Sequence, residues 1–259
     1  MKLTVLIENT RPENSALVAE HGLSFLVETP RKKFLFDCGQ TGAAWANAAA
    51  LGINLAEIKF AALSHSHYDH AGGFPSLLNF ARIEKIFVGE NFWAEKFSNE
   101  TYRGCGFDEK FLAARGVEEI ICRDVTEIDS GAWLVGNFAR RNNFETIPKK
   151  FLLGEKKIPD DFRDEIVLVL RGAGGLAIVT ACAHSGIVNI VESVREKFSA
   201  PIRTVIGGLH LTGASDERIS KTLAALKNFG VKKILPCHCS GENFMRNFER
   251  ISTGSVIEI

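Results

Sequence analysis

Three of the chain's seven histidines fall within the six residues His65-Ser66-His67-Tyr68-Asp69-His70. An apolar run, residues 60–64, leads into this segment, and Gly72-Gly73 follows it closely. Imidazole nitrogens and carboxylate oxygens are ligands for zinc, iron and manganese. The first two histidines can bind one metal ion, and the Asp69-His70 pair can bind a second. Two ions about 3.5–4 Å apart can share a water molecule. The segment therefore predicts part of a two-metal centre, and the fold must bring further ligands to it.

Three more histidines each follow an apolar segment that has the pattern of a strand. His184 follows residues 176–181, His210 follows residues 204–207, and His238 follows residues 231–236. Side chains at the carboxyl ends of strands can converge at one edge of a sheet. We expect His184 and His238 to supply the missing metal ligands. The role of His210 stays open between a ligand, a proton donor and a substrate contact.

Strand-like and helix-like segments alternate along much of the chain, which is typical of an α/β fold. The segments expected to be strands are residues 3–8, 24–29, 33–37, 60–64, 85–89, 166–171, 176–181, 204–207 and 231–236. The segments expected to be helices are residues 43–51, 74–82, 187–198 and 216–229. Residues 91–165 are irregular, and we expect a few strands there, joined by long loops that shape a substrate pocket.

Charge and composition narrow the class of protein. Basic and acidic residues number 31 each, so the net charge gives no support for a nucleic-acid or membrane partner. The pairs Arg140-Arg141 and Lys149-Lys150 are interpreted as solvated surface. No apolar run approaches the roughly 20 residues of a membrane helix, and residues 1–7 have the pattern of a strand rather than of a signal peptide. The six scattered cysteines favour free thiols. We expect a cytoplasmic protein.

Residues 63–73 (LSHSHYDHAGG) resemble the signature of the metallo-β-lactamase superfamily, and residues 34–39 (FLFDCG) resemble its upstream strand with a terminal aspartate. Residues 20–24, 180–189, 207–211 and 237–241 together resemble one branch, which carries the name 7,8-dihydropterin-6-methyl-4-(β-D-ribofuranosyl)aminobenzene-5′-phosphate synthase. The resemblance implies one domain over residues 1–259. It also implies a four-layer αββα sandwich, with two face-to-face sheets, outer helices and the metals at one edge.

The resemblance also implies a ligand set. By position, His65, His67 and His184 would hold one divalent ion, and Asp69, His70 and His238 a second. Zinc is the expected metal, with manganese or iron as alternatives. No aspartate follows residues 176–181, and Cys182 stands roughly where a bridging carboxylate is expected. A thiolate ligand would favour zinc, but our preferred interpretation of Cys182 is a buried structural residue.

The remaining candidates have other expected roles. Asp37 ends an apolar strand and is expected to orient a ligand histidine, so Asp69, His210 and Asp37 form the candidate catalytic group. The candidate substrate contacts are His21, Phe92, Trp93 and Tyr102, although the aromatic residues could equally pack within their own loop. Cys237 and Cys239 flank His238, and strand alternation predicts that their side chains pack on the opposite face.

The expected activity is that of a metal-dependent hydrolase-type enzyme acting on a small phosphorylated or ester-bearing molecule. A metal-bound water or hydroxide would be the nucleophile, and the second metal would stabilise the oxyanion. A reaction like that of the pterin and aryl-ribosyl-phosphate synthases is a narrower version. The alternatives are a di-iron redox protein of the same fold and a binding module without catalysis. The partner is a small molecule, and homo-oligomerisation stays open.

Overall fold

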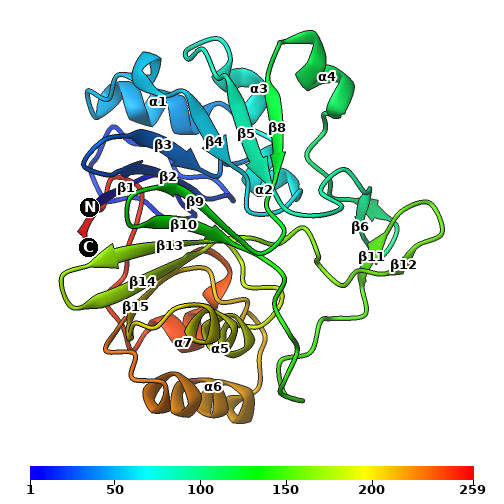
Figure 1. Ribbon diagram of the computed structural model, residues 1–259, viewed down its shortest axis with the longest axis vertical. Coiled ribbons are helices and arrows are strands. Elements are labelled where there is room, and N and C mark those ends of the chain that lie inside the picture. Colours follow the sequence, from blue (N-terminus) through cyan, green and yellow to red (C-terminus); the bar gives the residue numbers. More distant parts are fainter.

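The computed structural model describes all 259 residues and contains two large β-sheets that pack face to face (Figure 1). The first sheet has seven strands in the order β17-β1-β2-β3-β4-β5-β8. Their bounds are β1 Lys2–Ile7, β2 Ser24–Glu28, β3 Lys33–Phe36, β4 Phe60–Ala62, β5 Lys85–Val88, β8 Glu118–Ile121 and β17 Val256–Glu258. Strands β3, β4, β5 and β8 run parallel, so their carboxyl ends lie at one edge.

The second sheet has six strands in the order β16-β15-β14-β13-β10-β9. Their bounds are β9 Val125–Asp129, β10 Ala132–Val135, β13 Val167–Gly172, β14 Gly175–Thr180, β15 Ile202–Gly207 and β16 Lys233–Pro236. Strands β14, β15 and β16 are parallel neighbours. Their carboxyl ends therefore meet at one edge of this sheet, as the three strand-end histidines predicted.

Helices cover the outer face of each sheet. The seven helices are α1 Ala43–Ala50, α2 Tyr68–Ala71, α3 Phe74–Leu77, α4 Glu109–Ala114, α5 Ile187–Lys197, α6 Asp216–Asn228 and α7 Glu242–Met245. Side chains of α1 and α3 pack on the first sheet, and those of α5 and α6 pack on the second (Figure 1). A third apolar cluster, including Phe25, Phe36 and Leu168, fills the space between the sheets. The four-layer αββα sandwich is confirmed.

The spacing of apolar residues explains why the outer helices bury one face. Ile187, Ile190, Val191 and Val194 of α5 recur three or four residues apart, and all four are fully buried. Burying a side chain of this size stabilises the fold by about 1.5–3 kcal/mol. At the start of α6, the Ser215 hydroxyl accepts a hydrogen bond from the Arg218 amide and caps the helix.

A small third sheet lies within the segment expected to be irregular. It has four strands in the order β12-β11-β6-β7, with bounds β6 Lys96–Ser98, β7 Thr101–Tyr102, β11 Phe151–Leu153 and β12 Ile158–Pro159. Figure 1 shows it projecting from the side of the sandwich. Strands of two or three residues are too short to show a period of two in the sequence, which is why they were not predicted.

One predicted helix is shorter than expected. The helix predicted over residues 74–82 ends at Leu77, and the amides of Asn79 and Phe80 instead bond to carbonyls three residues earlier. The Phe80 side chain is exposed, so the largest apolar residue of the predicted second turn adds no packing to it. All six cysteines are free thiols, and no helix has the length and apolar character needed to cross a membrane.

Candidate metal centre

The first half of the site lies at the ends of the parallel strands β3 and β4. Asp37 follows β3 and is fully buried. Its carboxylate accepts hydrogen bonds from the backbone amide of Ser64, at 2.7 Å, and from the Ser64 hydroxyl, at 2.8 Å. It also lies 2.8 Å from Nδ1 of His70. Because Nδ1 is engaged, Nε2 of His70 faces the site, and Asp37 has the position of a residue that orients a ligand.

The histidine loop packs closely on the loop that follows Asp37. The Cys38 amide donates to the His70 carbonyl at 2.7 Å. A Cβ atom on Gly73 would lie 2.1 Å from the Cys38 carbonyl oxygen, so only glycine allows this approach. His67 is extended and α2 begins at Tyr68, so the two histidines before the helix and the Asp69-His70 pair within it reach the site from different directions.

The second half of the site comes from the other sheet. His184, His210 and His238 follow β14, β15 and β16, whereas His65 follows β4 of the first sheet. The site therefore lies where the edges of two facing sheets meet, not at one edge of a single sheet. A Cβ atom on Gly208 would lie 2.1 Å from the Ala181 carbonyl oxygen, so only glycine allows the chain before His210 to approach the end of β14 this closely.

Several strand-end residues of the site have a left-handed backbone. The φ angle is +63° at Asp37, +59° at Ala183, +50° at His210 and +53° at His238. A non-glycine residue in this region costs of the order of 1 kcal/mol, and such residues concentrate at functional sites. These angles turn the chain sharply as each strand ends.

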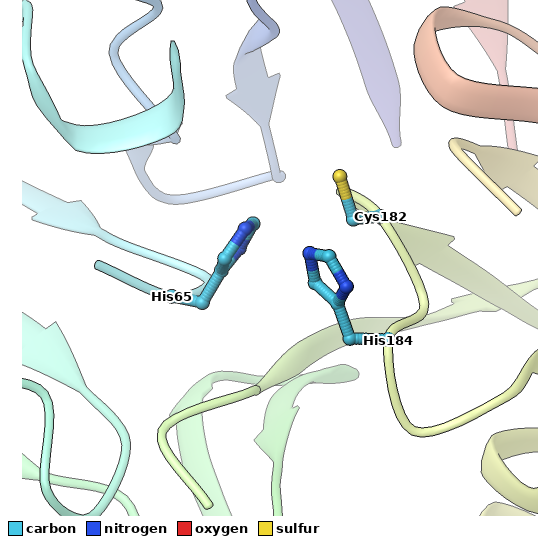
Figure 2. A group of neighbouring side chains, drawn as sticks. All are labelled: His65, Cys182 and His184. Carbon is cyan, nitrogen blue, oxygen red and sulfur yellow. The ribbon is translucent and has the colours of Figure 1, made fainter. Parts of the chain in front are cut away.

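One group of metal-donor atoms comes from His65, His67, Cys182 and His184. The donor atoms of His65, Cys182 and His184 all lie within 4.8 Å of one another. Figure 2 shows the His65 and His184 rings pointing toward one another, with the Cys182 sulfur beside them. Nδ1 of His67 lies 3.1 Å from Nε2 of His65. The structure thus brings together the three histidines expected at the first metal.

A second group comes from Asp69, His70, Cys182 and His238. The Nε2 atoms of His70 and His238 are 3.2 Å apart, and the Cys182 sulfur is 3.3 Å from Nε2 of His70. Oδ2 of Asp69 lies 3.3 Å from Nε2 of His238 and 3.5 Å from Nε2 of His70. The three residues expected at the second metal are therefore also together, and the sulfur of Cys182 belongs to both groups.

Unpartnered nitrogens show that these residues fit a bound cation. Nε2 of His67 and both ring nitrogens of His184 are buried without a hydrogen-bond partner. A buried polar atom without a partner costs roughly 1–3 kcal/mol, and nearly all such atoms in proteins are satisfied. Coordination of a divalent metal would satisfy one nitrogen of a ligand ring. Clustered imidazole, carboxylate and thiol donors also match the preferences of zinc.

The protonation states of the histidines differ within the site. Burial lowers the pKa of His67 to about 3 and holds the pKa of His65 and His184 well below the usual range. These rings are neutral at pH 7, the form that binds metals. Burial also acts to lower the pKa of His70, but the carboxylates of Asp69 and Asp37 outweigh it and raise that pKa to about 10. A metal at His70 must therefore displace a proton.

Two buried carboxylates fix the backbone on either side of the metal donors. Glu165 accepts hydrogen bonds from the amides of His184, at 2.6 Å, and Ser185, at 2.7 Å. Asp164 accepts one from the amide of Ser66, at 2.9 Å. Because Asp164 and Glu165 are adjacent, one short segment holds the ligand loops of both sheets. Neither carboxylate was predicted from the sequence.

Five of the metal donors line a cavity of about 440 Å³: His67, Asp69, Cys182, His184 and His238. The other residues that line it come from loops around the sheet edges and from the four-stranded sheet: Asn9, His21, Tyr68, Ser98, Arg103, Lys150, Phe151, His210, Thr212 and Cys239. His21 is half exposed, lies 3.3 Å from the Asp69 carboxylate and stacks on His238. Nε2 of His210 is buried without a partner, and its ring lies edge-on to His184.

Comparison with known proteins decides the family. The model of the metallo-beta-lactamase superfamily matches residues 17–91. The chain is 31% identical to the 7,8-dihydropterin-6-methyl-4-(beta-D-ribofuranosyl)-aminobenzene-5′-phosphate synthase of Methanocaldococcus jannaschii, over 100% of this chain and 96% of that protein. The chain belongs to the metallo-β-lactamase superfamily. The resemblance seen in the sequence is confirmed, and membership of this superfamily indicates binding of divalent metal.

Solved structures agree with this assignment. Tm1679, described as a metal-dependent hydrolase of the beta-lactamase superfamily, superimposes with a TM-score of 0.87 at 31% identity, over 100% of this chain and 99% of that one. The metallo-beta-lactamase fold protein YhfI from Bacillus subtilis superimposes with a TM-score of 0.60 at 12% identity, covering 99% of each chain. The second match supports the fold alone.

The aromatic residues expected to contact substrate lie outside the cavity of this superfamily member. Phe92 is buried and packs edge-on against Trp93 in the core beside α4, and the Trp93 indole donates to Glu119. The Tyr102 side chain is about half exposed, and its ring packs edge-on against Phe97. None of the three lines the cavity, and their contacts match the alternative of packing within the segment. Phe151 lines the cavity in their place.

Two further expectations need correction. Cys239 does not pack on the opposite face of a strand, because β16 ends at Pro236 and residues 238–240 form a 3₁₀ helix. Strand alternation no longer applies there, and Cys239 lines the cavity beside Cys182. Lys150, interpreted as solvated surface, also lines the cavity. Neighbouring Lys149 does not, and nothing in the sequence distinguishes the two.

Proposed function

We propose that the chain is a metal-dependent hydrolase-type enzyme that binds two divalent ions, zinc foremost, and acts on a small phosphorylated or ester-bearing molecule. The observation that carries the proposal is the convergence of two donor groups on the floor of one cavity, with Cys182 common to both. The buried, unpartnered ring nitrogens of His184 support it, because a cation would satisfy one of them.

Each residue of the site has a separate proposed role. His65, His67 and His184 would hold one ion, Asp69, His70 and His238 the other, and Cys182 would serve both. Divalent ions held there would lower the pKa of water and stabilise negative charge on oxygen. Asp37 fixes the orientation of His70 through the 2.8 Å contact with Nδ1. The ligand rings on the cavity floor face the space that a substrate would enter.

His210 is proposed as a substrate contact rather than a metal ligand. Burial, with a smaller contribution from the charge of Arg218, lowers its pKa to about 4, so the ring is neutral at pH 7. A neutral imidazole can donate one hydrogen bond from whichever nitrogen carries the proton. With Nε2 buried and unpartnered beside the metal donors, His210 would orient a substrate oxygen.

A narrower version of the proposal follows from the full-length relative. The name of that relative describes synthesis of a pterin-aminobenzene ribosyl 5′-phosphate, and the relative aligns with the whole of this chain. The cavity offers rings of Phe151 and Tyr68 against which a flat heterocycle could stack. We therefore propose a pterin or aryl-ribosyl phosphate as the first substrate class to test.

Removal and return of metal tests the proposal. The purified protein is expected to contain close to two divalent ions per chain by elemental analysis. Chelation should lower turnover of aryl phosphate esters or of the pterin and aryl-ribosyl substrates by at least about 100-fold, and zinc or manganese should restore it. Turnover that persists after the metal has been removed would refute the proposal. Two irons with a redox-dependent spectrum would instead favour the di-iron alternative.

Substitution of the shared cysteine provides a second test. Burial raises the pKa of the Cys182 thiol well above its usual range, so a thiolate there requires an adjacent cation. Cys182→Ser is expected to weaken binding of the second ion at least about 10-fold and to abolish the thiolate charge-transfer absorption of the cobalt-substituted protein. Cys122→Ser, at a buried cysteine between the sheets, is the matched control and should change neither. An unchanged cobalt spectrum in Cys182→Ser would exclude the thiolate ligand.

A further inference from the structure

Two cations line the cavity without an acidic partner. Arg103 and Lys150 both border it, and neither forms an ion pair in the structure. The Arg103 guanidinium lies over the ring of Tyr68, at 5.4 Å, and its NH1 atom is 3.3 Å from the Tyr68 hydroxyl. Nζ of Lys150 lies 5.2 Å from the ring centre of Phe151. Both charges are thus held against aromatic rings.

The cavity contains no carboxylate free to neutralise these charges. Asp69 is the only acidic residue that lines it, and its Oδ2 atom already contacts three histidines. A cavity lined by one sign of charge attracts ligands of the opposite sign. The cavity wall therefore favours a substrate with an anionic group.

Backbone hydrogen bonds fix the main chain of both basic residues relative to the metal donors. The Arg103 amide donates to the Lys96 carbonyl at 2.7 Å, and the Arg103 carbonyl accepts from the amide of Tyr68 at 2.9 Å. The Lys150 carbonyl accepts from the amide of Asn99 at 2.7 Å. Arg103 is therefore tied to both the four-stranded sheet and the histidine loop, and Lys150 to the same sheet.

The four-stranded sheet is itself anchored in the protein interior. Lys96 of β6 is 1% exposed and forms ion pairs with Asp160, at 2.8 Å, and Asp164, at 2.6 Å. The Asp164 carboxylate also accepts a hydrogen bond from the amide of Ser66 in the histidine loop. The sheet and the metal-binding loop thus share one buried anchor. Cations held in place before binding lose less conformational entropy when the ligand arrives.

We propose that Arg103 and Lys150, together with the Ser98 hydroxyl, form a binding subsite for a phosphate group of the substrate, separate from the metal donors. The inference rests on the proposed function, because it assigns one end of the substrate in the same cavity. An arginine fork binds two phosphate oxygens at once, and a lysine supplies a compact charge to the third. Two cations and a hydroxyl match a phosphate dianion, whereas a carboxylate is satisfied by one arginine.

Binding of ribose 5-phosphate to the metal-loaded protein tests the subsite by calorimetry. Arg103→Gln and Lys150→Gln should each weaken binding about 10-fold, and the double variant about 100-fold. Metal content should stay unchanged in every variant, so the differences report on the side chains alone. Lys149→Gln, one residue away and outside the cavity, is the matched control and should bind as the parent does.

Three results would overturn the subsite: unchanged binding in the double variant, an equal loss in Lys149→Gln, or equal binding of ribose and ribose 5-phosphate. Acetate binding that weakens in parallel and matches ribose 5-phosphate in affinity would reassign the subsite to carboxylates. Failure of the subsite and failure of the proposed function give different results. A failure of that function would appear as missing metal or chelator-resistant turnover, whereas a failure of the subsite would appear only in these binding constants.

Discussion

Replacement of His67 by alanine is expected to lower the metal content from two ions to at most one and to reduce turnover by more than about 100-fold. Loss of a residue that merely supports a ligand costs 10–100-fold in metal affinity or activity, so loss of a ligand should exceed that range. The structure gives the reason. Nδ1 of His67 lies 3.1 Å from Nε2 of His65, and the low pKa of the buried ring keeps it neutral, which is the form that binds a metal.

The same variant gives a second readout through stability. A ligand that binds only the folded state stabilises it in proportion to its affinity, so metal should raise the melting temperature of the parent protein. In His67→Ala the metal-induced rise in melting temperature should largely disappear, while the circular dichroism spectrum should remain that of the folded parent protein. Asn143→Ala, an exposed polar residue outside the cavity, should retain both the metal and the rise. Full metal content together with parental turnover in His67→Ala would contradict the proposed centre.

Local sequence pattern was sufficient to predict one half of the site. The histidine segment is compact in the chain, so its ligand types and spacing were visible without a fold. His184 and His238 were predictable because each follows a clearly apolar strand, and such strands end at a common edge. The four-layer sandwich followed from the resemblance and is confirmed.

The other half depends on contacts that leave no local signal. Lys96 forms an ion pair with Asp164, which lies 68 residues later in the sequence, and the strand that carries Lys96 has only three residues. Phe92 and Phe151 are both aromatic residues in the irregular segment, yet one packs in the core and the other lines the cavity. Residue type did not distinguish them. Cys182 was interpreted as a core residue, but β14 ends at Thr180, so its sulfur faces the donors from a loop.

Replacement of Lys96 by methionine is expected to lower the free energy of unfolding by about 3–5 kcal/mol, the cost of breaking a buried ion pair by removing one partner. The substitution leaves the carboxylates of Asp160 and Asp164 buried without their cation. Burial already raises the pKa of Asp160 even with Lys96 present, so its charged form is costly. Chemical denaturation at several pH values measures the loss. Lys33→Met, which removes an exposed partner of Glu57, is the control and should change stability far less.

The pH dependence distinguishes an unpaired charge from simple loss of packing. Without Lys96 the folded-state pKa of the Asp160 carboxyl rises further above its unfolded value, because the lysine charge no longer opposes the effect of burial. A group with a raised folded pKa favours the folded state while it is protonated, and that advantage is lost as the pH rises through the folded pKa. The loss of stability in Lys96→Met should therefore be smaller at pH 5 than at pH 8, and Asp160→Asn should partly reverse it at pH 8. A loss that is the same at both pH values would mean that packing, not charge, explains the effect. The ion pairs of Lys96 also anchor the four-stranded sheet that carries Arg103 and Lys150. Lys96→Met should therefore weaken ribose 5-phosphate binding even under conditions in which the variant remains folded.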